Sequence, residues 1–296
     1  MKHDANTHPE MLTAAPGPQD INWYPGHMSK TRRRLEEDVR RVDACIQLLD
    51  ARIPRSSQNP VLAEIIGEKP CLTVFNRADQ ADPEVTALWR KAFPVSVETT
   101  ASLQTGVGAV VPAIRRLLAD TLTRYEAKGQ VGRSLKLMVV GVPNVGKSTF
   151  INSLTRKKSL KAEDRPGVTR TVQWMRVDQG LDLLDTPGIL WPKLGDPETG
   201  MNLAFTGAIK NEILDTTELA MALMGVLRET YPARLTERYK INPAQEGDSL
   251  ALLEAAARKR GFLISGGELD IDRMALTLLE EFRGGKLGRI TLERPQ

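Results

Sequence analysis

The stretch "LKLMVVGVPNVGKSTF", Leu135 to Phe150, joins an apolar run to a glycine-bearing loop that opens a helical pattern. Within it, "GVPNVGKS" matches G-x-x-x-x-G-K-[ST], a phosphate-binding loop placed between a strand and a helix. In such a loop Gly141 and Gly146 let the backbone curl, so that N–H groups converge on phosphate oxygens. Lys147 then faces the β- and γ-phosphates, and Ser148 offers a hydroxyl to Mg²⁺. The context favours this interpretation over an ordinary surface turn.

The candidate phosphate-binding residues are Pro143, Asn144, Val145, Gly146, Lys147, Ser148 and Thr149. Downstream, "LDLLDTPG" ends an apolar strand at Asp185, whose carboxylate can hold Mg²⁺ directly or through water. The N–H of Gly188 can reach a γ-phosphate. Between the two motifs, "DRPGVTR" offers the hydroxyl of Thr169, which can complete the metal shell when a γ-phosphate is present. The D-x-x-G pattern alone is a weak signal because it is common, but it is a strong signal when it follows a phosphate loop.

Upstream of the phosphate loop, "TVFNRADQAD" (Thr73 to Asp82) ends an apolar run in a tetrapeptide of the type N-K-x-D. The carboxylate of Asp79 can accept hydrogen bonds from N1–H and the exocyclic amine of guanine, a donor pair that adenine lacks. Asn76 would brace the loop, and Arg77 can lay its aliphatic stem on the base. A turn after a strand is the alternative when the tetrapeptide is taken alone.

The guanine-reading tetrapeptide precedes the phosphate loop, which reverses the usual order. Strands alternate with helical patterns up to about residue 200, so we expect an α/β domain with a mostly parallel sheet. The ligand loops of a parallel sheet lie at the carboxyl ends of its strands, whatever their order along the chain. A circular permutation, with its joint at "YEAKGQVGRSLK", therefore leaves the site intact.

Composition limits the class of protein. Of the 296 residues, 41% are hydrophobic and 26% are charged, as in a globular protein, and no apolar run approaches the length of a membrane span. The polar N-terminal stretch has no secretion signal, so we expect a cytoplasmic protein. Cys45 and Cys71 lie in apolar runs, where buried hydrophobic residues are expected in place of a disulfide or metal pair.

Positive charge gathers around the phosphate loop. Residues 124–170 hold eleven Lys/Arg against three acids, an excess of eight, whereas residues 201–296 are nearly neutral. A polyanion-facing surface is therefore expected beside the phosphate loop, with Arg156, Lys157 and Lys158 as its core. A solvated face with one lysine for the nucleotide is the alternative.

The chain changes character near residue 200, after which the patterns are helical. We expect a disordered tail (1–20), a permuted domain (21–200) and a small helical C-terminal domain (201–296). This arrangement, with "NWYPGHM", "LLDARIPRSSQNP", "DRPGVTR" and "LLDTPGILWPK", resembles the circularly permuted GTPases of ribosome assembly, from Ile21 to Leu292. The resemblance implies a P-loop G domain that hydrolyses GTP to GDP and phosphate.

The same resemblance implies partners and cofactors. It predicts a monomeric assembly factor for the large ribosomal subunit that contacts rRNA and ribosomal proteins and is stimulated by the particle. Mg²⁺ is expected at Ser148, Thr169 and Asp185, and K⁺ at Asn144. His27 of "PGHM" is the implied catalytic residue, because Ile189 stands where many GTPases carry a water-positioning Gln.

Two departures from the family pattern affect the base site. Arg77 replaces a lysine. The family's base-loop signature S-A-x-x-G places Ser102 and Leu103 when counted back from Gly106, although Thr100 and Ala101 fit the chemistry better. A P-loop kinase or ATPase is a competing interpretation that "NRAD" disfavours. A GTP-dependent binding module for a non-ribosomal protein is the other.

Overall fold

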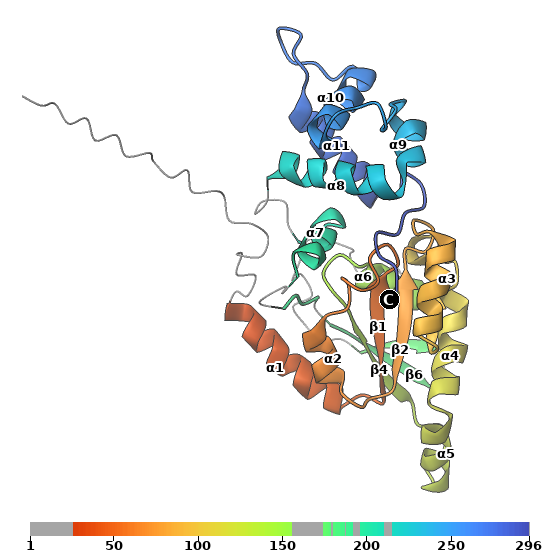
Figure 1. The fold of residues 1–296 in the computed structure, drawn as a ribbon. Helices are drawn as coiled ribbons and strands as arrows, with labels where there is room; N and C mark the ends of the chain where they lie inside the picture. The colour runs from red at the N-terminus through yellow and green to blue at the C-terminus, as the bar shows by residue number, and fades with distance from the viewer. Residues whose placement is uncertain are drawn as a thin grey trace, which may run out of the picture.

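One mostly parallel sheet carries the predicted ligand loops (Figure 1). The structure is a computed structural model that describes residues 26–155, 174–178, 180–186, 188–191, 196–209 and 215–295. Within them the strands are β1 (Ala44–Asp50), β2 (Cys71–Asn76), β3 (Ser96–Glu98), β4 (Leu135–Val140), β5 (Trp174–Asp178) and β6 (Leu181–Asp185). Their order is β3-β2-β1-β4-β6-β5, and of these neighbours only β5 and β6 are antiparallel. The predicted fold class is confirmed.

The carboxyl ends of the central strands are level with one another. The register pairs Asp50 at the end of β1 with Asn76 at the end of β2, and Val139 of β4 with Asp185 of β6. The upstream tetrapeptide and the downstream phosphate loop therefore leave the sheet at the same edge, although they occur in reversed chain order. The permuted arrangement follows from this register.

The helices begin and end close to the positions that the sequence indicates. They are α1 (Gly26–Arg40), α2 (Pro60–Ile66), α3 (Pro83–Ala92), α4 (Val110–Leu117), α5 (Ala119–Ala127), α6 (Lys147–Thr155), α7 (Pro197–Phe205), α8 (Thr216–Thr230), α9 (Pro232–Tyr239), α10 (Ser249–Arg260) and α11 (Ile271–Arg283), with short 3-10 turns η1 (Ala101–Leu103) and η2 (Val107–Ala109). Asp82 caps α3, accepting from the backbone N–H groups of Glu84 and Val85. The helices α4 and α5 are separated at Leu118 (φ −106°, ψ 19°), which leaves helical geometry. Beyond it, α5 buries no side chain.

Helices cover both faces of the sheet, so its central strands are apolar on both sides. In β1, Ile46 packs in a core with Ile114 of α4 and residues of α6, whereas the alternate residue Cys45 packs with Leu35 of α1 and residues of α2. Burial raises the pKa of the Cys45 thiol to about 12. Cys45 is buried and Cys71 is half-buried, both as free thiols.

The chain beyond α7 is helical, as the sequence predicts, and α8, α10 and α11 pack through Leu223, Leu253 and Leu278. None of the helices in the described ranges is long and apolar enough to cross a membrane. The division near residue 200 stays a prediction, since α7 runs from Pro197 to Phe205 across it.

A C-terminal return segment, residues 290–293, runs back from the helical part to the sheet. The backbone N–H of Ile290 donates to the carbonyl of Gln80 at 2.9 Å, and that of Leu292 donates to the carbonyl of Arg52 at 2.8 Å. The buried carboxylate of Glu293 accepts from the backbone N–H of Ser56 and from Asn202 Nδ2 of α7. This segment ties the loops that follow β1 and β2 to the helical part of the chain.

Candidate functional site

The loop between β4 and α6 turns tightly through two residues in the left-handed region. Asn144 has φ 57° and Gly146 has φ 98°. A Cβ at Gly146 would lie 2.6 Å from Nδ2 of Asn76, and one at Gly141 would lie 2.7 Å from the carbonyl oxygen of Leu48. The two glycines of the motif are therefore required by the close approach of the base loop and of β1.

Lys147 is the first residue of α6 and is only 8% exposed. Its Nζ donates to the carbonyl oxygens of Gly141 at 3.1 Å and Val142 at 2.9 Å, inside the loop. Burial lowers the pKa of Lys147 to about 8, and the charge of Asp185 opposes that shift. A phosphate anion at this place would favour the charged ammonium. Val145 is buried within the same loop, and Ser148 occupies the first turn of α6.

The D-x-x-G segment lies against the phosphate loop. Asp185, 3% exposed, ends β6 beside Val139 of β4. A Cβ at Gly188 would lie 2.6 Å from Lys147 Nζ and 3.0 Å from Pro143 Cα, so glycine lets the two segments meet.

Oxygen donors of the kind that Mg²⁺ prefers, the Ser148 hydroxyl and the Asp185 carboxylate, belong to these adjoining segments. The described residues contain no group of three or more His, Cys, Asp or Glu that could hold a metal ion. This donor set fits a Mg²⁺ ion that is also held by phosphate oxygens.

Asn76 joins three loops at the end of β2. Its Nδ2 donates to the carbonyl oxygen of Val145 in the phosphate loop at 2.9 Å. Its Oδ1 accepts from the Thr99 hydroxyl at 3.1 Å and from the backbone N–H of Ala101 at 3.2 Å. The backbone N–H of Asp79 in turn donates to Thr100 Oγ1 at 3.2 Å. The tetrapeptide, the phosphate loop and the segment after β3 are thus held as one unit.

The carboxylate of Asp79 has bonding capacity left for a ligand. Its Oδ1 is shielded from solvent, and no described residue donates a hydrogen bond to it. A buried carboxylate oxygen without a donor is costly, and a ligand that brings N–H groups would relieve that cost. This geometry suits the recognition of guanine.

The segment after β3 contacts the base loop through residues other than Ser102 and Leu103, which the spacing from Gly106 indicates. Thr100 and Ala101 are buried and bond to the tetrapeptide, whereas Ser102 and Leu103 are exposed, Leu103 by 65%. These contacts favour Thr100 and Ala101 as the residues that adjoin the base loop. Any contact of Ser102 or Leu103 with a base stays a prediction.

Arg77 does more than frame a base. Its backbone has φ 60°, and its guanidinium donates to the carbonyl oxygen of Asn144 at 3.0 Å and to that of Arg283 at 3.3 Å. Its Nε lies 3.8 Å from Asp50 Oδ2. Arg77 therefore connects the base loop, the phosphate loop and the end of α11.

Asp50 and Arg52 lie next to this site, and sequence reasoning assigned them no role. The guanidinium of Arg52, fully buried, forms a bidentate pair with Asp50 at 2.9 and 2.7 Å and also donates to the carbonyl of Phe282 in α11. Burial would raise the pKa of Asp50, but Arg52 and then Arg77 outweigh it, and the pKa is lowered. The stretch "LLDAR" was the available signal, a charged pair directly after an apolar strand.

A similar contact ties the phosphate loop to α7. Nδ2 of Asn144 donates to the carbonyl oxygen of Gly207 at 2.7 Å. Arg283 caps the end of α7, donating to the carbonyls of Phe205 at 3.0 Å and Ala204 at 2.7 Å. The helical part of the chain therefore contacts the candidate nucleotide site directly.

Several predicted residues fall where little or nothing is described. His27 belongs to the first turn of α1, but its side chain lies outside the described residues, as do Thr169 and the cluster Arg156, Lys157 and Lys158. Ile189 is described: it is 3% exposed and packs in the core below α1 and α2. Its side chain is therefore not available to position a water molecule.

Comparison with known proteins places this site in a family. Residues 136–242 match the family model described as 50S ribosome-binding GTPase. Ribosome biogenesis GTPase A of Bacillus cereus is 43% identical over 280 residues, which cover 93% of this chain and 94% of that protein. Mitochondrial ribosome-associated GTPase 1 of Bos taurus is 32% identical over 295 residues, covering 92% and 88%.

Solved structures give the same result. The GDP-bound structure of TM YlqF superposes with a TM-score of 0.63 at 26% identity, covering 89% of this chain and 99% of that chain. GNP-bound YlqF from T. maritima gives 0.61 at 26% identity, covering 90% and 99%.

Proposed function

Because the chain belongs to the ribosome biogenesis GTPase A family of circularly permuted GTPases, we propose that it assembles the large ribosomal subunit. The chain is a GTPase of ribosome biogenesis. The proposal adds that it acts on the large subunit and that the ribosomal particle stimulates its GTP hydrolysis. One observation carries the proposal: Asn76 holds the base loop against the phosphate loop through hydrogen bonds, in a chain whose relatives include a ribosome-associated GTPase. We further propose that it is a cytoplasmic monomer.

The proposed nucleotide site uses the residues described above. Asp79 reads guanine while Asn76 fixes its loop, and Lys147 with the backbone of residues 143–149 holds the phosphates. GTPases of this family generally use Mg²⁺, which would be held by Ser148, Asp185 and Thr169 and would neutralise charge on the phosphates. Gly188 offers its N–H to the γ-phosphate.

Two further residues complete the proposal for hydrolysis. His27 acts at the attacking water or the developing charge, since Ile189 is buried and apolar. Asn144 ligates K⁺, with Nδ2 held by Gly207 and Oδ1 left to face the cation. His27→Ala should lower particle-stimulated turnover and keep nucleotide affinity within a few fold. Equal rates in K⁺ and Na⁺ would remove the cation from the proposal.

Co-sedimentation with ribosomal particles tests the partner. The protein should bind immature large subunits more tightly with a non-hydrolysable GTP analogue than with GDP, and these particles should raise its GTP turnover. Small subunits serve as the control and should do neither. Binding to a non-ribosomal protein, without binding to particles, would replace the proposal with that of a GTP-dependent binding module.

A further inference from the structure

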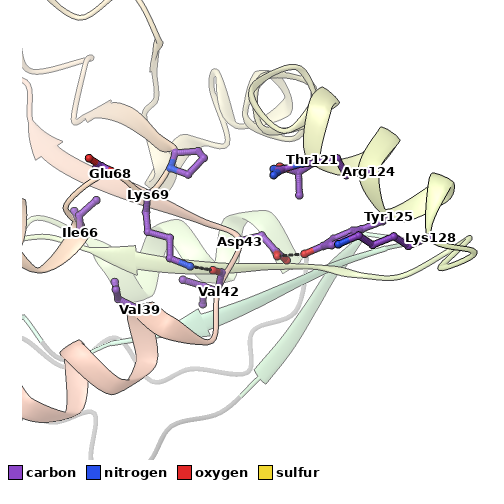
Figure 2. Close-up of a pocket in the computed structure, with 11 residues that line it drawn as sticks. Val39, Val42, Asp43, Ile66, Glu68, Lys69, Thr121, Arg124, Tyr125 and Lys128 are labelled. Atoms are coloured by element: carbon purple, nitrogen blue, oxygen red, sulfur yellow. Dashed lines mark hydrogen bonds between the residues drawn. The ribbon is translucent and has the colours of Figure 1, made fainter.

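A pocket of about 620 Å³ opens at the amino ends of β1 and β2, opposite the nucleotide loops (Figure 2). Its walls come from the end of α1, the segment between α2 and β2, and α5. Asp43 and Lys69 precede the two strands, and Tyr125 of α5 reaches over Asp43. Strands of six or seven residues separate this pocket from the nucleotide loops by about 20 Å.

Cations dominate the rim of this pocket and the surface next to it. Lys69, Arg124 and Lys128 line the pocket, and Arg133 and Lys136 continue it toward β5. We call these five residues the amino-edge surface. None of them forms an ion pair with another described residue, whereas Arg238 and Arg260 of the helical part share the carboxylate of Glu281.

Two acids, Asp43 and Glu68, lie among the lining residues, so together with the five cations of the amino-edge surface they leave a net charge of 5 − 2 = +3. Asp43 accepts from the Tyr125 hydroxyl and from the backbone N–H of Lys136, so both carboxylate oxygens are engaged. The hydrogen bond to Asp43 raises the pKa of Tyr125, so its phenol stays neutral. Glu68 is the other acid among the lining residues, and it is exposed to water.

Two aromatic rings lie within the amino-edge surface. The guanidinium of Arg133 lies 4.2 Å from the ring centroid of Tyr125, and Lys136 Nζ lies 5.3 Å from that of Trp174. Trp174, on the edge strand β5, is 36% exposed. Cations interleaved with accessible rings are the composition of surfaces that hold nucleic acid, through phosphate contacts and base stacking.

We propose that the amino-edge surface binds the phosphodiester backbone of RNA, an inference that rests on the proposed ribosomal partner. Three of the five cations line the pocket and two lie beyond it, so the surface offers contacts to successive phosphates of a chain. The surface lies a strand's length away from the nucleotide loops, so RNA bound there leaves the phosphate loop accessible.

A triple variant tests the surface: Arg124→Ala, Lys128→Ala and Arg133→Ala, all exposed side chains outside the nucleotide site. Lys69 is left in place because its Nζ donates to the carbonyl of Val42. Binding is measured with the GTP analogue across a salt series, to large-subunit particles and to protein-free large-subunit rRNA. The variant should bind both about tenfold more weakly near 0.1 M salt, with a log–log salt slope smaller by about 2.

The matched control removes three other exposed cations: Lys91→Ala, Arg116→Ala and Lys259→Ala. It should keep the wild-type affinity and salt slope, and both triple variants should keep nucleotide affinity and basal hydrolysis. If both triple variants lost the same RNA and particle affinity, the effect would be one of bulk charge, and the proposal that the amino-edge surface binds RNA would be overturned. Wild-type binding by the Arg124, Lys128 and Arg133 variant would overturn it too.

Ultraviolet crosslinking gives a measurement on the unmodified protein. RNA adducts are expected on Tyr125 or Trp174, and adducts confined to other peptides would overturn the surface. Binding to particles but not to rRNA would assign the partner to a ribosomal protein, and displacement by millimolar inorganic phosphate would assign a small-anion site. Failure of the wild type to bind particles or rRNA would instead overturn the proposed function.

Discussion

Asp79 offers the sharpest test of base recognition at the scale of single residues. Its buried Oδ1 accepts no hydrogen bond from the described residues. In Asp79→Asn an amide donor replaces this acceptor, so GTP affinity should fall at least about tenfold while xanthosine triphosphate, with its 2-oxo group, gains. Competition binding with the two nucleotides and ATP measures the change. An undiminished preference for GTP would contradict the assignment.

Lys147 should take up protons when nucleotide binds. Burial lowers its pKa to about 8 in the nucleotide-free protein, and phosphate anions favour the charged form. Near pH 8, binding should therefore take up about half a proton, and GTP affinity should decline as pH rises further. Calorimetry in two buffers of different ionisation enthalpy measures the uptake, and Lys147→Arg should abolish it.

The same lowered pKa sets a stability trend. Between pH 8 and the usual 10.5 for lysine, the unfolded chain binds more protons at this residue than the folded chain. The contribution of Lys147 to the free energy of unfolding should therefore rise with pH across that window. A fall across the window, relative to Lys147→Arg, would mean that the ammonium is not desolvated.

Arg77 should resist replacement by the lysine that its relatives' motif calls for. The guanidinium reaches the carbonyl of Arg283 through Nη1 and that of Asn144 through Nη2, and the single ammonium of a shorter lysine does not reproduce this planar fork. Arg77→Lys should lower the free energy of unfolding by about 1 to 2 kcal/mol, a value reduced because the side chain is 28% exposed. Urea titration measures it.

Arg90→Lys is the control for that substitution. Arg90 pairs with Glu98 at the surface, where a lysine can serve as well, so a change within about 0.5 kcal/mol is expected. Equal effects of the two substitutions would show that Arg77 makes no special connection.

At the scale of elements, the turn between β4 and α6 depends on Gly146. A Cβ there would strike Nδ2 of Asn76, which is held by the carbonyl of Val145. Gly146→Ala should therefore separate the base loop from the phosphate loop and lower GTP affinity about a hundredfold or more. Gly132→Ala is the matched control, because Gly132 also has positive φ but a Cβ there would meet nothing within 4 Å. Comparable losses in both would attribute the effect to backbone strain alone.

The elements themselves could be predicted because their signals are local. The apolar runs before the tetrapeptide, the phosphate loop and the D-x-x-G motif indicated the strands that became β2, β4 and β6. No Pro or Gly marks the interruption at Leu118, so the sequence pattern did not indicate it. Motif spacing likewise indicated Asn76, Lys147 and Asp185, which lie in adjoining loops, and counting indicated Ser102 and Leu103, whose contact with a base stays a prediction, while Thr100 and Ala101 bond to the tetrapeptide.

At the scale of the whole molecule, prediction fails where partners are far apart in sequence. The contacts of Arg52 with Phe282 and of Arg77 with Arg283 span 230 and 206 residues. Neither the composition nor the hydrophobic periodicity of a sequence indicates contacts between residues so far apart along the chain. These contacts, with that of Asn144 to Gly207, join the candidate site to the ends of α11 and α7, which sequence patterns alone assigned to a helical region beyond residue 200.

Removal of residues 289–296 should expose this dependence. Without the return segment, the buried Ser56 and Asn202 lose the carboxylate of Glu293, and the indole N–H of Trp89 loses its carbonyl acceptor. Unfolding free energy should fall by about 3 kcal/mol or more, because several buried donors lose their partners together. Urea unfolding and GTP titration measure both consequences. Deletion of residues 295 and 296 alone should change neither.

The return segment also has a consequence for the order of synthesis. Ala51, the residue after β1, accepts a hydrogen bond from the hydroxyl of Thr291, a residue translated 240 positions later. When all six strands have left the ribosome but α11 has not, the guanidinium of Arg52 still lacks its carbonyl acceptors, Phe282 and Arg283. We therefore expect the GTP site of each new molecule to mature late, once the segment around residue 290 has left the exit tunnel and closed the loops made first.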